Sequence, residues 1–165
     1  MKDYQLGTNA TIFGPHGDLR ITAEELSHGL QMLMEHGRYR GKQILRTESV
    51  EEILKKQWSY DGHNGDTAGG TFLSYGLGEY LIGGPSHVCK NRDIELCGHT
   101  GEAWGLSAGV FFRPGTKDGF VYIMNGEGLE KNVDVRSAGR FSSNNIWEES
   151  IMDAICRAMA GDAAI

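Results

Sequence analysis

The chain has 165 residues, with 22 acidic and 16 basic side chains and a net charge of −6 at pH 7. This length suits one domain with a sizeable core, so we expect residues 1–165 to form a single domain. The negative charge argues against nucleic acid or an anionic membrane as a partner. No apolar run is long enough for a membrane span, and Met1-Lys2-Asp3-Tyr4 lacks the apolar segment of a signal peptide.

Two helices are expected in the first third of the chain. Thr22-Ala23-Glu24-Glu25 is a capping box, which predicts a helix over 22–37 that ends at Gly37. A second helix is predicted over 47–58, with Thr47 as its cap and Trp58 at its end. Both helices carry apolar residues at helical spacing: Leu26, Leu30, Leu33 and Met34 in the first, and Val50, Ile53 and Leu54 in the second.

The middle of the chain is strand-like and the end is helical. After a loop over 61–70, strands are expected within 72–125, with breaks at Gly83-Gly84-Pro85 and Pro114-Gly115. A last helix is predicted over 144–160, capped by Ser143 or Asn144 and stopped by Gly161. Its apolar residues at helical spacing, which need a sheet to lie on, are Trp147, Ile151, Ala154, Ile155 and Ala158. These elements predict an α+β fold in which helices cover an antiparallel sheet.

One stretch, residues 98–112, organises the rest. It carries glycines at 98, 101, 105 and 109 and is expected to form the first strand of a hairpin with the strand over 120–124. Strand glycines often mark places where a ligand or another backbone comes close. The polar pair His99 and Thr100 lies at the start of this stretch, which makes it the first candidate for a site.

Three patches of the sequence resemble the serine β-lactamase-like family of class C β-lactamases, D-alanyl-D-alanine peptidases and esterases. Gly98-His99-Thr100-Gly101 is similar to the family's third signature, Lys-Thr-Gly or His-Thr-Gly. The stretch 14–26 is similar to a helix entry of these proteins, although Asp18 stands where the family has a second glycine. Tyr75-Gly76-Leu77-Gly78 is similar to the strand entry upstream of the third signature. The patches follow the family's order and span nearly the whole chain.

The resemblance implies a role for four residues. His99 would hold the polar network around the nucleophile and the substrate carboxylate, and Thr100 would contact substrate. The amide of Glu102, beyond Gly101, would help form the oxyanion hole. The same pattern has a simpler explanation, a polar strand end that faces water.

The chain departs from the family at the nucleophile. No serine is followed by lysine three residues later, and Tyr-x-Asn is absent. The chain therefore resembles the C-terminal portion of a serine hydrolase, with the last three strands of the family sheet and its final helix. Alone it would be inactive, and no cofactor is implied. Its partner would be the upstream half of the fold, or a second copy at an open sheet edge. The family implies a bacterial, periplasmic or secreted location.

The cysteines and serines leave alternatives open. Cys156 is expected in the core, and a disulfide between Cys89 and Cys97 is one option for the short loop between them. A zinc site of His87, Cys89, Cys97 and His99 is another, although the spacing lacks the usual Cys-x-x-Cys. Ser27, Ser74 and Ser107 have no neighbouring base in the sequence and are not expected to be nucleophiles. The alternative to a hydrolase portion is a free-standing, non-catalytic binding or interaction domain.

Overall fold

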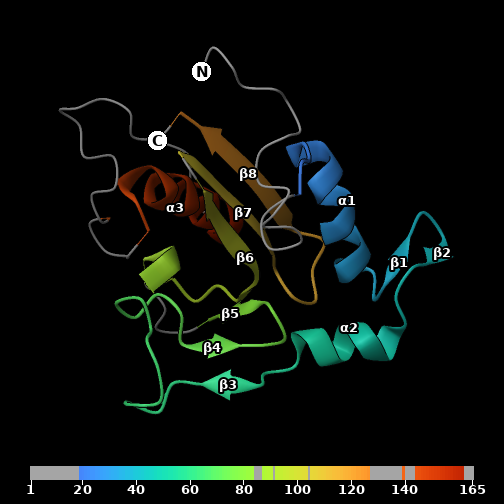
Figure 1. Ribbon diagram of the computed structural model, residues 1–165, viewed down its shortest axis with the longest axis horizontal. Coiled ribbons are helices and arrows are strands. Elements are labelled where there is room, and N and C mark those ends of the chain that lie inside the picture. The colour runs from blue at the N-terminus through green and yellow to red at the C-terminus, as the bar shows by residue number, and fades with distance from the viewer. Residues whose placement is uncertain are drawn as a thin grey trace, which may run out of the picture.

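Six short strands, each hydrogen-bonded to the next along the chain, form one antiparallel sheet. The computed structural model describes residues 19–83, 87–90, 92–103, 105–126, 139 and 144–161. The strands run in the order β3 (Trp58–Ser59), β4 (Ser74–Tyr75), β5 (Tyr80–Ile82), β6 (Leu96–Ala103), β7 (Leu106–Phe112) and β8 (Gly119–Asn125). A 3₁₀ turn, η2 (His87–Cys89), lies between β5 and β6. The described residues also form three α-helices, so the predicted α+β class is confirmed (Figure 1).

The two N-terminal helices form close to where the sequence predicts them. Helix α1 (Ala23–Met34) begins at the predicted capping box, in which the Thr22 hydroxyl accepts from the Glu25 amide at 3.1 Å. A hairpin of β1 (Arg38–Tyr39) and β2 (Lys42–Gln43) leads to α2 (Thr47–Leu54). The cap of α2 is Arg46 instead of Thr47, whose hydroxyl donates to the His36 carbonyl at 3.3 Å. The prediction that α2 reaches Trp58 is wrong, because Trp58 pairs with Tyr75 in the sheet.

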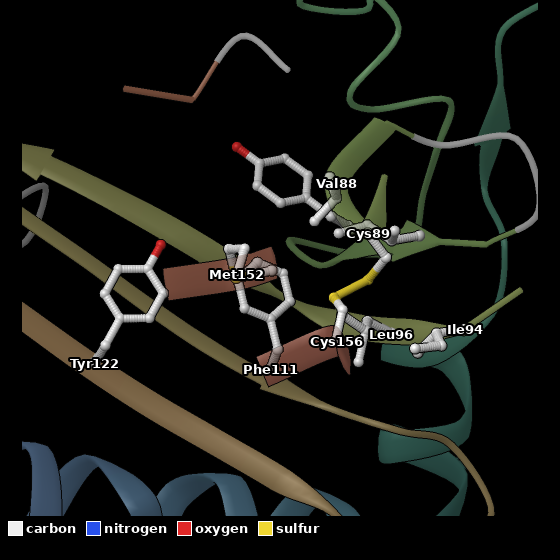
Figure 2. Packing of buried hydrophobic residues seen from close by; sticks show 10 residues of the cluster. Val88, Cys89, Ile94, Leu96, Phe111, Tyr122, Met152 and Cys156 are labelled. Carbon is white, nitrogen blue, oxygen red and sulfur yellow. A yellow bond between two sulfur atoms is a disulfide. The ribbon is translucent and has the colours of Figure 1, made fainter. Parts of the chain in front are cut away.

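Helices α1 and α3 (Ile146–Ala160) pack on opposite faces of the sheet. Phe111 and Phe112, adjacent on β7, point to opposite faces because side chains alternate along a strand. Phe112 packs in one buried cluster with Leu30 of α1. Phe111 packs in the other with Met152 and Cys156 of α3, as Figure 2 shows. The sheet therefore separates two cores.

Two strand glycines allow close approaches within the sheet. A Cβ on Gly98 would lie 2.0 Å from the carbonyl oxygen of Val110 on β7. A Cβ on Gly109 would lie 2.3 Å from the ring of Tyr122, which crosses β7 at this point. The prediction that strand glycines mark close approaches is confirmed at these positions. At both, the group that comes close belongs to a neighbouring strand of the same sheet.

Two stretches that were each predicted as one strand form two strands in the structure. The stretch 98–112 reverses between Ala103 and Leu106, so that β6 and β7 form a hairpin, and β8 pairs with β7. Gly105 has φ +86°, a conformation that glycine adopts without strain and that permits this reversal. The strand over 72–82 likewise divides into β4 and β5, joined by the turn 76–79. In both places the sequence contains turn glycines inside an apolar run.

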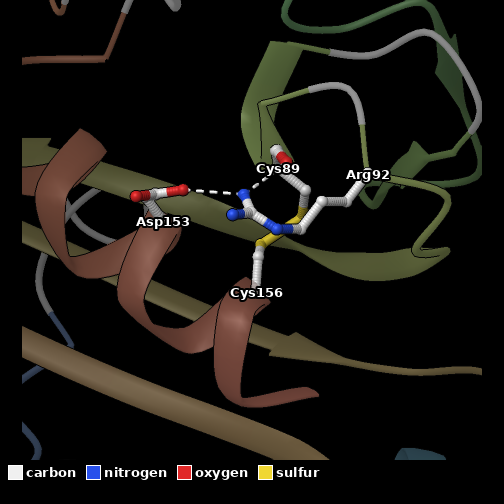
Figure 3. The surroundings of a disulfide bond; sticks show 4 residues. All are labelled: Cys89, Arg92, Asp153 and Cys156. Atoms are coloured by element: carbon white, nitrogen blue, oxygen red, sulfur yellow. Dashed lines mark hydrogen bonds and ion pairs between the residues drawn. A yellow bond between two sulfur atoms is a disulfide. The ribbon is translucent and has the colours of Figure 1, made fainter. Parts of the chain in front are cut away.

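A disulfide between Cys89 and Cys156 fixes α3 to η2 (Figure 3). The two Cα atoms lie 5.6 Å apart, within the usual range for a bridge. Arg92 reinforces the junction, because one guanidinium nitrogen donates to Asp153 at 2.7 Å and to the Cys89 carbonyl at 3.2 Å. The alternative of a Cys89–Cys97 bond is therefore wrong. Cys97 lies on the α1 side of the sheet, in the cluster with Leu30 and Phe112.

The face of α3 that is buried differs from the predicted one. Glu149, Met152 and Cys156 are the buried residues of the helix. Trp147 is 54 % exposed, and Ala154 and Ala158 are also exposed. The disulfide and the packing of Met152 orient the helix, which leaves part of its apolar face uncovered by the described residues. The N-cap of the helix is Asn145 instead of the predicted Ser143 or Asn144, and its C-cap is Gly161, where the stop was predicted.

Removing the disulfide is expected to destabilise the fold. The bond closes a sequence separation of 67 residues, and loss of such a bridge from a small domain costs ~2–5 kcal/mol. We expect the double variant Cys89→Ser/Cys156→Ser to lose stability in this range in urea unfolding monitored by circular dichroism. Cys97→Ala is the matched control, because Cys97 is buried without a bond. Three free thiols in the native protein, or a bond to Cys97 in a peptide map, would contradict this pairing.

A methyl group on Gly109 is expected to disrupt the contact between β7 and Tyr122. Overpacking at such a site costs ~1–3 kcal/mol, so Gly109→Ala should lower the free energy of unfolding by that amount. Gly101 lies on the neighbouring strand, where an added Cβ would have no atom within 4 Å. Gly101→Ala should therefore change stability by less than about 0.5 kcal/mol. Equal effects of the two substitutions in the same urea titration would refute the assigned contact.

Candidate active-site wall on β6

Strand β6 is paired along most of its length on one side and only along part of it on the other. Residues Cys97 to Ala103 pair with β7. On the other side, pairing with β5 ends where Tyr80 lies opposite Gly98. Within the described part of the chain, no strand covers that edge from His99 to Ala103. The predicted residues His99, Thr100, Gly101 and Glu102 therefore lie along an edge that no described strand covers, the open edge of β6.

The His99 ring lies in a stack of aromatic rings. It stacks on Tyr80 with the ring centroids 4.3 Å apart and the planes 15° apart. The other ring stacked on Tyr80 is Phe72, at 3.8 Å and 18°, and Tyr75 meets Tyr80 edge-on at 4.6 Å. Offset and edge-on arrangements of this kind add to the stabilisation from burial. Tyr80 is 9 % exposed, so the stack is anchored in the core.

The backbone of Thr100 faces the open edge. The His99 ring, which rests on Tyr80 of β5, contacts the Thr100 carbonyl oxygen through Nδ1. That carbonyl therefore points to the β5 side of β6. Residues two apart in a strand direct their backbone groups to the same side, so the Glu102 N–H and C=O also point to this edge. Gly101 and Glu102 are exposed, and His99 and Thr100 are partly buried.

A polar network that the sequence did not predict supports the hairpin. Asn145, at the start of α3, donates through its side-chain amide to the Ser107 hydroxyl at 3.1 Å and to Glu148 at 3.1 Å. Tyr122 donates to the other oxygen of Glu148 at 3.0 Å. Ser107 is opposite Glu102 in the β6–β7 pairing. The signal that could have revealed this network is a cap at Asn145 with Glu148 three residues later, one position beyond the predicted cap.

Ser107 cannot serve as a nucleophile in this structure. Its side chain is completely buried and its hydroxyl accepts the hydrogen bond from Asn145. A nucleophilic serine needs access to substrate as well as a base within hydrogen-bond reach. The expectation for Ser107 is therefore supported by its burial. The hydroxyls of Ser27 and Ser74 donate hydrogen bonds to backbone carbonyls, Ser27 to that of Glu24 and Ser74 to that of Leu81.

The alternative zinc site lacks one of its four proposed ligands. Cys89 is bonded to Cys156 and so offers no thiolate. Cys97 packs with the α1 cluster, and the His99 ring stacks on Tyr80. The side chain of His87 lies outside the described residues. Among those the structure describes, no group of three or more His, Cys, Asp and Glu residues is placed to hold a metal ion.

Cys97 and Glu79 interact in a poorly solvated region. Burial, followed by the negative charge of Glu79, raises the pKa of the Cys97 thiol to about 12. Burial also raises the pKa of the Glu79 carboxyl above its ordinary value. A thiol with so high a pKa is a poor nucleophile at neutral pH, because the thiolate is the reactive form. Cys97 is therefore a core residue.

Glu79 is expected to reduce stability as the pH rises. Its folded-state pKa is raised, so between the ordinary glutamate pKa and the raised one the folded state binds more protons than the unfolded state. Stability then falls as pH increases through this range. We expect Glu79→Gln to flatten that fall and to stabilise the protein at neutral pH, measured by urea unfolding across the acidic to neutral range.

Glu25 provides a control of opposite sign. Hydrogen bonds from the backbone and hydroxyl of Thr22 lower the pKa of its carboxyl, so its stabilising contribution is lost as the pH falls. Glu25→Gln should therefore change how the free energy of unfolding varies with pH in the acidic range. Near neutral pH the variant and the wild type should show nearly the same pH dependence. Parallel profiles for Glu79→Gln and wild type would show that the buried carboxyl has no such effect.

Comparisons with known proteins identify no relative of this chain. No protein-family model, curated protein or solved structure matches the chain. Within the described residues, no helix is both long enough and apolar enough to cross a membrane.

Proposed function

We propose that this chain is the C-terminal portion of a serine hydrolase of the β-lactamase, penicillin-binding or esterase type. The reaction would be acyl transfer on a β-lactam, a peptidoglycan peptide or an ester. The observation that carries the proposal is the open edge of β6 at His99, Thr100, Gly101 and Glu102. His99, Thr100 and Gly101 belong to the stretch that resembles the third signature, and Glu102 follows it. An extended ligand can pair with an edge only where no strand already occupies it.

The order of elements supports the same proposal. The resemblance implies three last strands followed by a terminal helix, and β6, β7 and β8, the last three of the six described strands of the sheet, precede α3 in the chain. In this proposal Thr100 offers its hydroxyl to the substrate. The Glu102 amide, at the open edge, donates to the oxyanion of the tetrahedral intermediate, an interaction typically worth a few kcal/mol.

The nucleophile would come from outside this chain. The sequence contains no Ser-x-x-Lys and no Tyr-x-Asn. It does contain Ser-x-Asn, the other form of the family's second signature, at 142–144 and 143–145. These triplets follow the third signature, whereas the second signature precedes the third in the family. The chain alone is therefore expected to be inactive, with the upstream half of the fold as its partner.

A binding domain is the second candidate. The missing nucleophile favours it, as does the exposure of Trp147 on α3. In that case the β6 edge or the apolar part of α3 would bind a partner, and no covalent chemistry would occur. A second copy of the chain could pair through an exposed strand edge.

Covalent labelling separates the two candidates. We expect the purified chain alone to show no mass shift after incubation with a fluorescent penicillin and a fluorophosphonate. The chain produced together with the polypeptide encoded directly upstream should label stoichiometrically on a serine of that polypeptide. An adduct on this chain alone would contradict the absent nucleophile, and no adduct in the presence of the upstream polypeptide would refute the hydrolase proposal.

Thr100 provides the matched variant in the labelling experiment. Thr100→Val removes the hydroxyl and keeps the shape of the side chain, so the labelling rate should fall about tenfold, the effect of losing one hydrogen bond of ~1.4 kcal/mol in the transition state. Thr47→Val, on α2, removes a hydroxyl that donates to the His36 carbonyl and should leave the rate unchanged. Equal rates for the Thr100 variant and wild type would exclude Thr100 from the site.

A further inference from the structure

The contact between His99 and the Thr100 carbonyl determines which nitrogen of His99 carries the proton. Nδ1 of the ring contacts the carbonyl oxygen of Thr100. A carbonyl oxygen can only accept a hydrogen bond, so Nδ1 must be the protonated nitrogen in this contact. A neutral imidazole has one protonated and one unprotonated nitrogen, which leaves Nε2 as a hydrogen-bond acceptor.

The ring is held in this orientation by stacking. Tyr80 lies parallel to His99 at 4.3 Å, and Phe72 lies parallel to Tyr80 at 3.8 Å. A half-turn of the imidazole would keep the stack but would place carbon instead of Nδ1 at the Thr100 carbonyl. The stack fixes the plane of the ring, and the Thr100 carbonyl selects one of the two orientations within that plane.

Nε2 of His99 has no hydrogen-bond partner among the described residues. The only hydrogen bond of the His99 side chain there is the one from Nδ1 to Thr100. His99 is partly exposed, at the point where the pairing of β5 with β6 has just ended. Of the two ring nitrogens, Nε2 is therefore the one left for a ligand.

We propose that Tyr80 is a positioning residue that fixes the plane of the His99 ring, within which the Thr100 carbonyl selects the Nδ1–H tautomer, so that Nε2 accepts a hydrogen bond or a proton from a ligand at the β6 edge. The ligand group is then a hydroxyl or an N–H donor. This assignment of a role rests on the proposed function, in which His99 lines the site, but the tautomer itself does not. A lysine in the same position could offer only donors, so the two residue types would contact different atoms of a ligand.

The tautomer can be measured without any catalytic assay. In the full chain labelled with ¹⁵N-histidine, long-range ¹H–¹⁵N spectra separate the protonated ring nitrogen from the unprotonated one. The pH is set well above the ordinary histidine pKa of ~6.5, so that rings are neutral. The His99 signals are assigned by their loss in His99→Asn. We expect Nδ1 protonated and Nε2 unprotonated in the wild type, and an Nε2–H ring or an even mixture would overturn the proposal.

Variants of the stack test the part played by Tyr80. Tyr80→Phe keeps the flat ring and should retain the wild-type spectrum. Tyr80→Leu keeps an apolar side chain but removes the stacking, and should shift His99 toward the Nε2–H form that a free histidine side chain favours. Tyr75→Leu is the matched control, because Tyr75 contacts the Tyr80 ring edge-on and belongs to the same cluster. An unchanged His99 spectrum in folded Tyr80→Leu would refute the positioning role.

A second variant covers the case in which Tyr80→Leu does not fold. Phe72→Leu leaves Tyr80 in place and removes the ring stacked on it, so the His99 signals should show a measurable admixture of the second tautomer. An unchanged spectrum in folded Phe72→Leu would then count against the stack. If the hydrolase labelling fails but His99 shows the expected tautomer, only the proposed function is refuted, and the tautomer assignment stands.

Discussion

The position at which β5 begins determines where the edge of β6 opens. The turn before β5 is fixed to the end of α2, because the Leu77 amide donates to the Ile53 carbonyl at 2.9 Å. The Gln57 amide donates to the Tyr75 carbonyl at 2.8 Å and holds β4 beside the same segment. Gly76 must be glycine in this arrangement, since a Cβ there would lie 2.3 Å from the Ile53 carbonyl oxygen. With the turn fixed, β5 starts at Tyr80 and leaves the remainder of β6, beyond its pairing with Tyr80, without a partner strand on that side among the described residues.

The hairpin that carries the open edge is supported from one face of the sheet. Gly109 lets the Tyr122 ring cross β7, and the Tyr122 hydroxyl reaches Glu148 in the first turn of α3. The disulfide between Cys89 and Cys156 holds the other end of the same helix. Helix α3 is thus fixed at both ends against this face. Rigid support of this kind keeps a strand edge in position when no neighbouring strand does so.

The sequence predicted local elements well and their pairing poorly. The capping box at Thr22, the turn at Pro114-Gly115 and the stop at Gly161 were recognisable because each is fixed by residues adjacent in the chain. The division of 98–112 into two strands was missed because the apolar pattern continues through the reversal. The Cys89–Cys156 bond was missed because its partners are 67 residues apart, and spacing carries no information on such a pair.

The candidate site was predictable as a set of residues but not as a surface. His99, Thr100, Gly101 and Glu102 are consecutive, so a motif was enough to identify them. The stack on His99 brings together Phe72, Tyr80 and His99 from three segments, and only the fold places them in contact. The network at Ser107 depends in the same way on Asn145 from the distant start of α3.

An open strand edge by itself binds a small ligand weakly, and this limits what the chain can do alone. Thr100 and Glu102 offer at most four backbone groups to a ligand, each hydrogen bond contributing about 1 kcal/mol net. Their sum corresponds to a dissociation constant of about 1 mM, before the loss of translational and rotational freedom is counted. A small-molecule site on β6 therefore needs a second wall. In the hydrolase proposal that wall is the part of the fold that also carries the nucleophile. The upstream half of the fold would then supply both the second wall and the nucleophile. A free-standing binding domain must instead recruit a partner large enough to bury additional surface, such as the exposed face of α3 around Trp147.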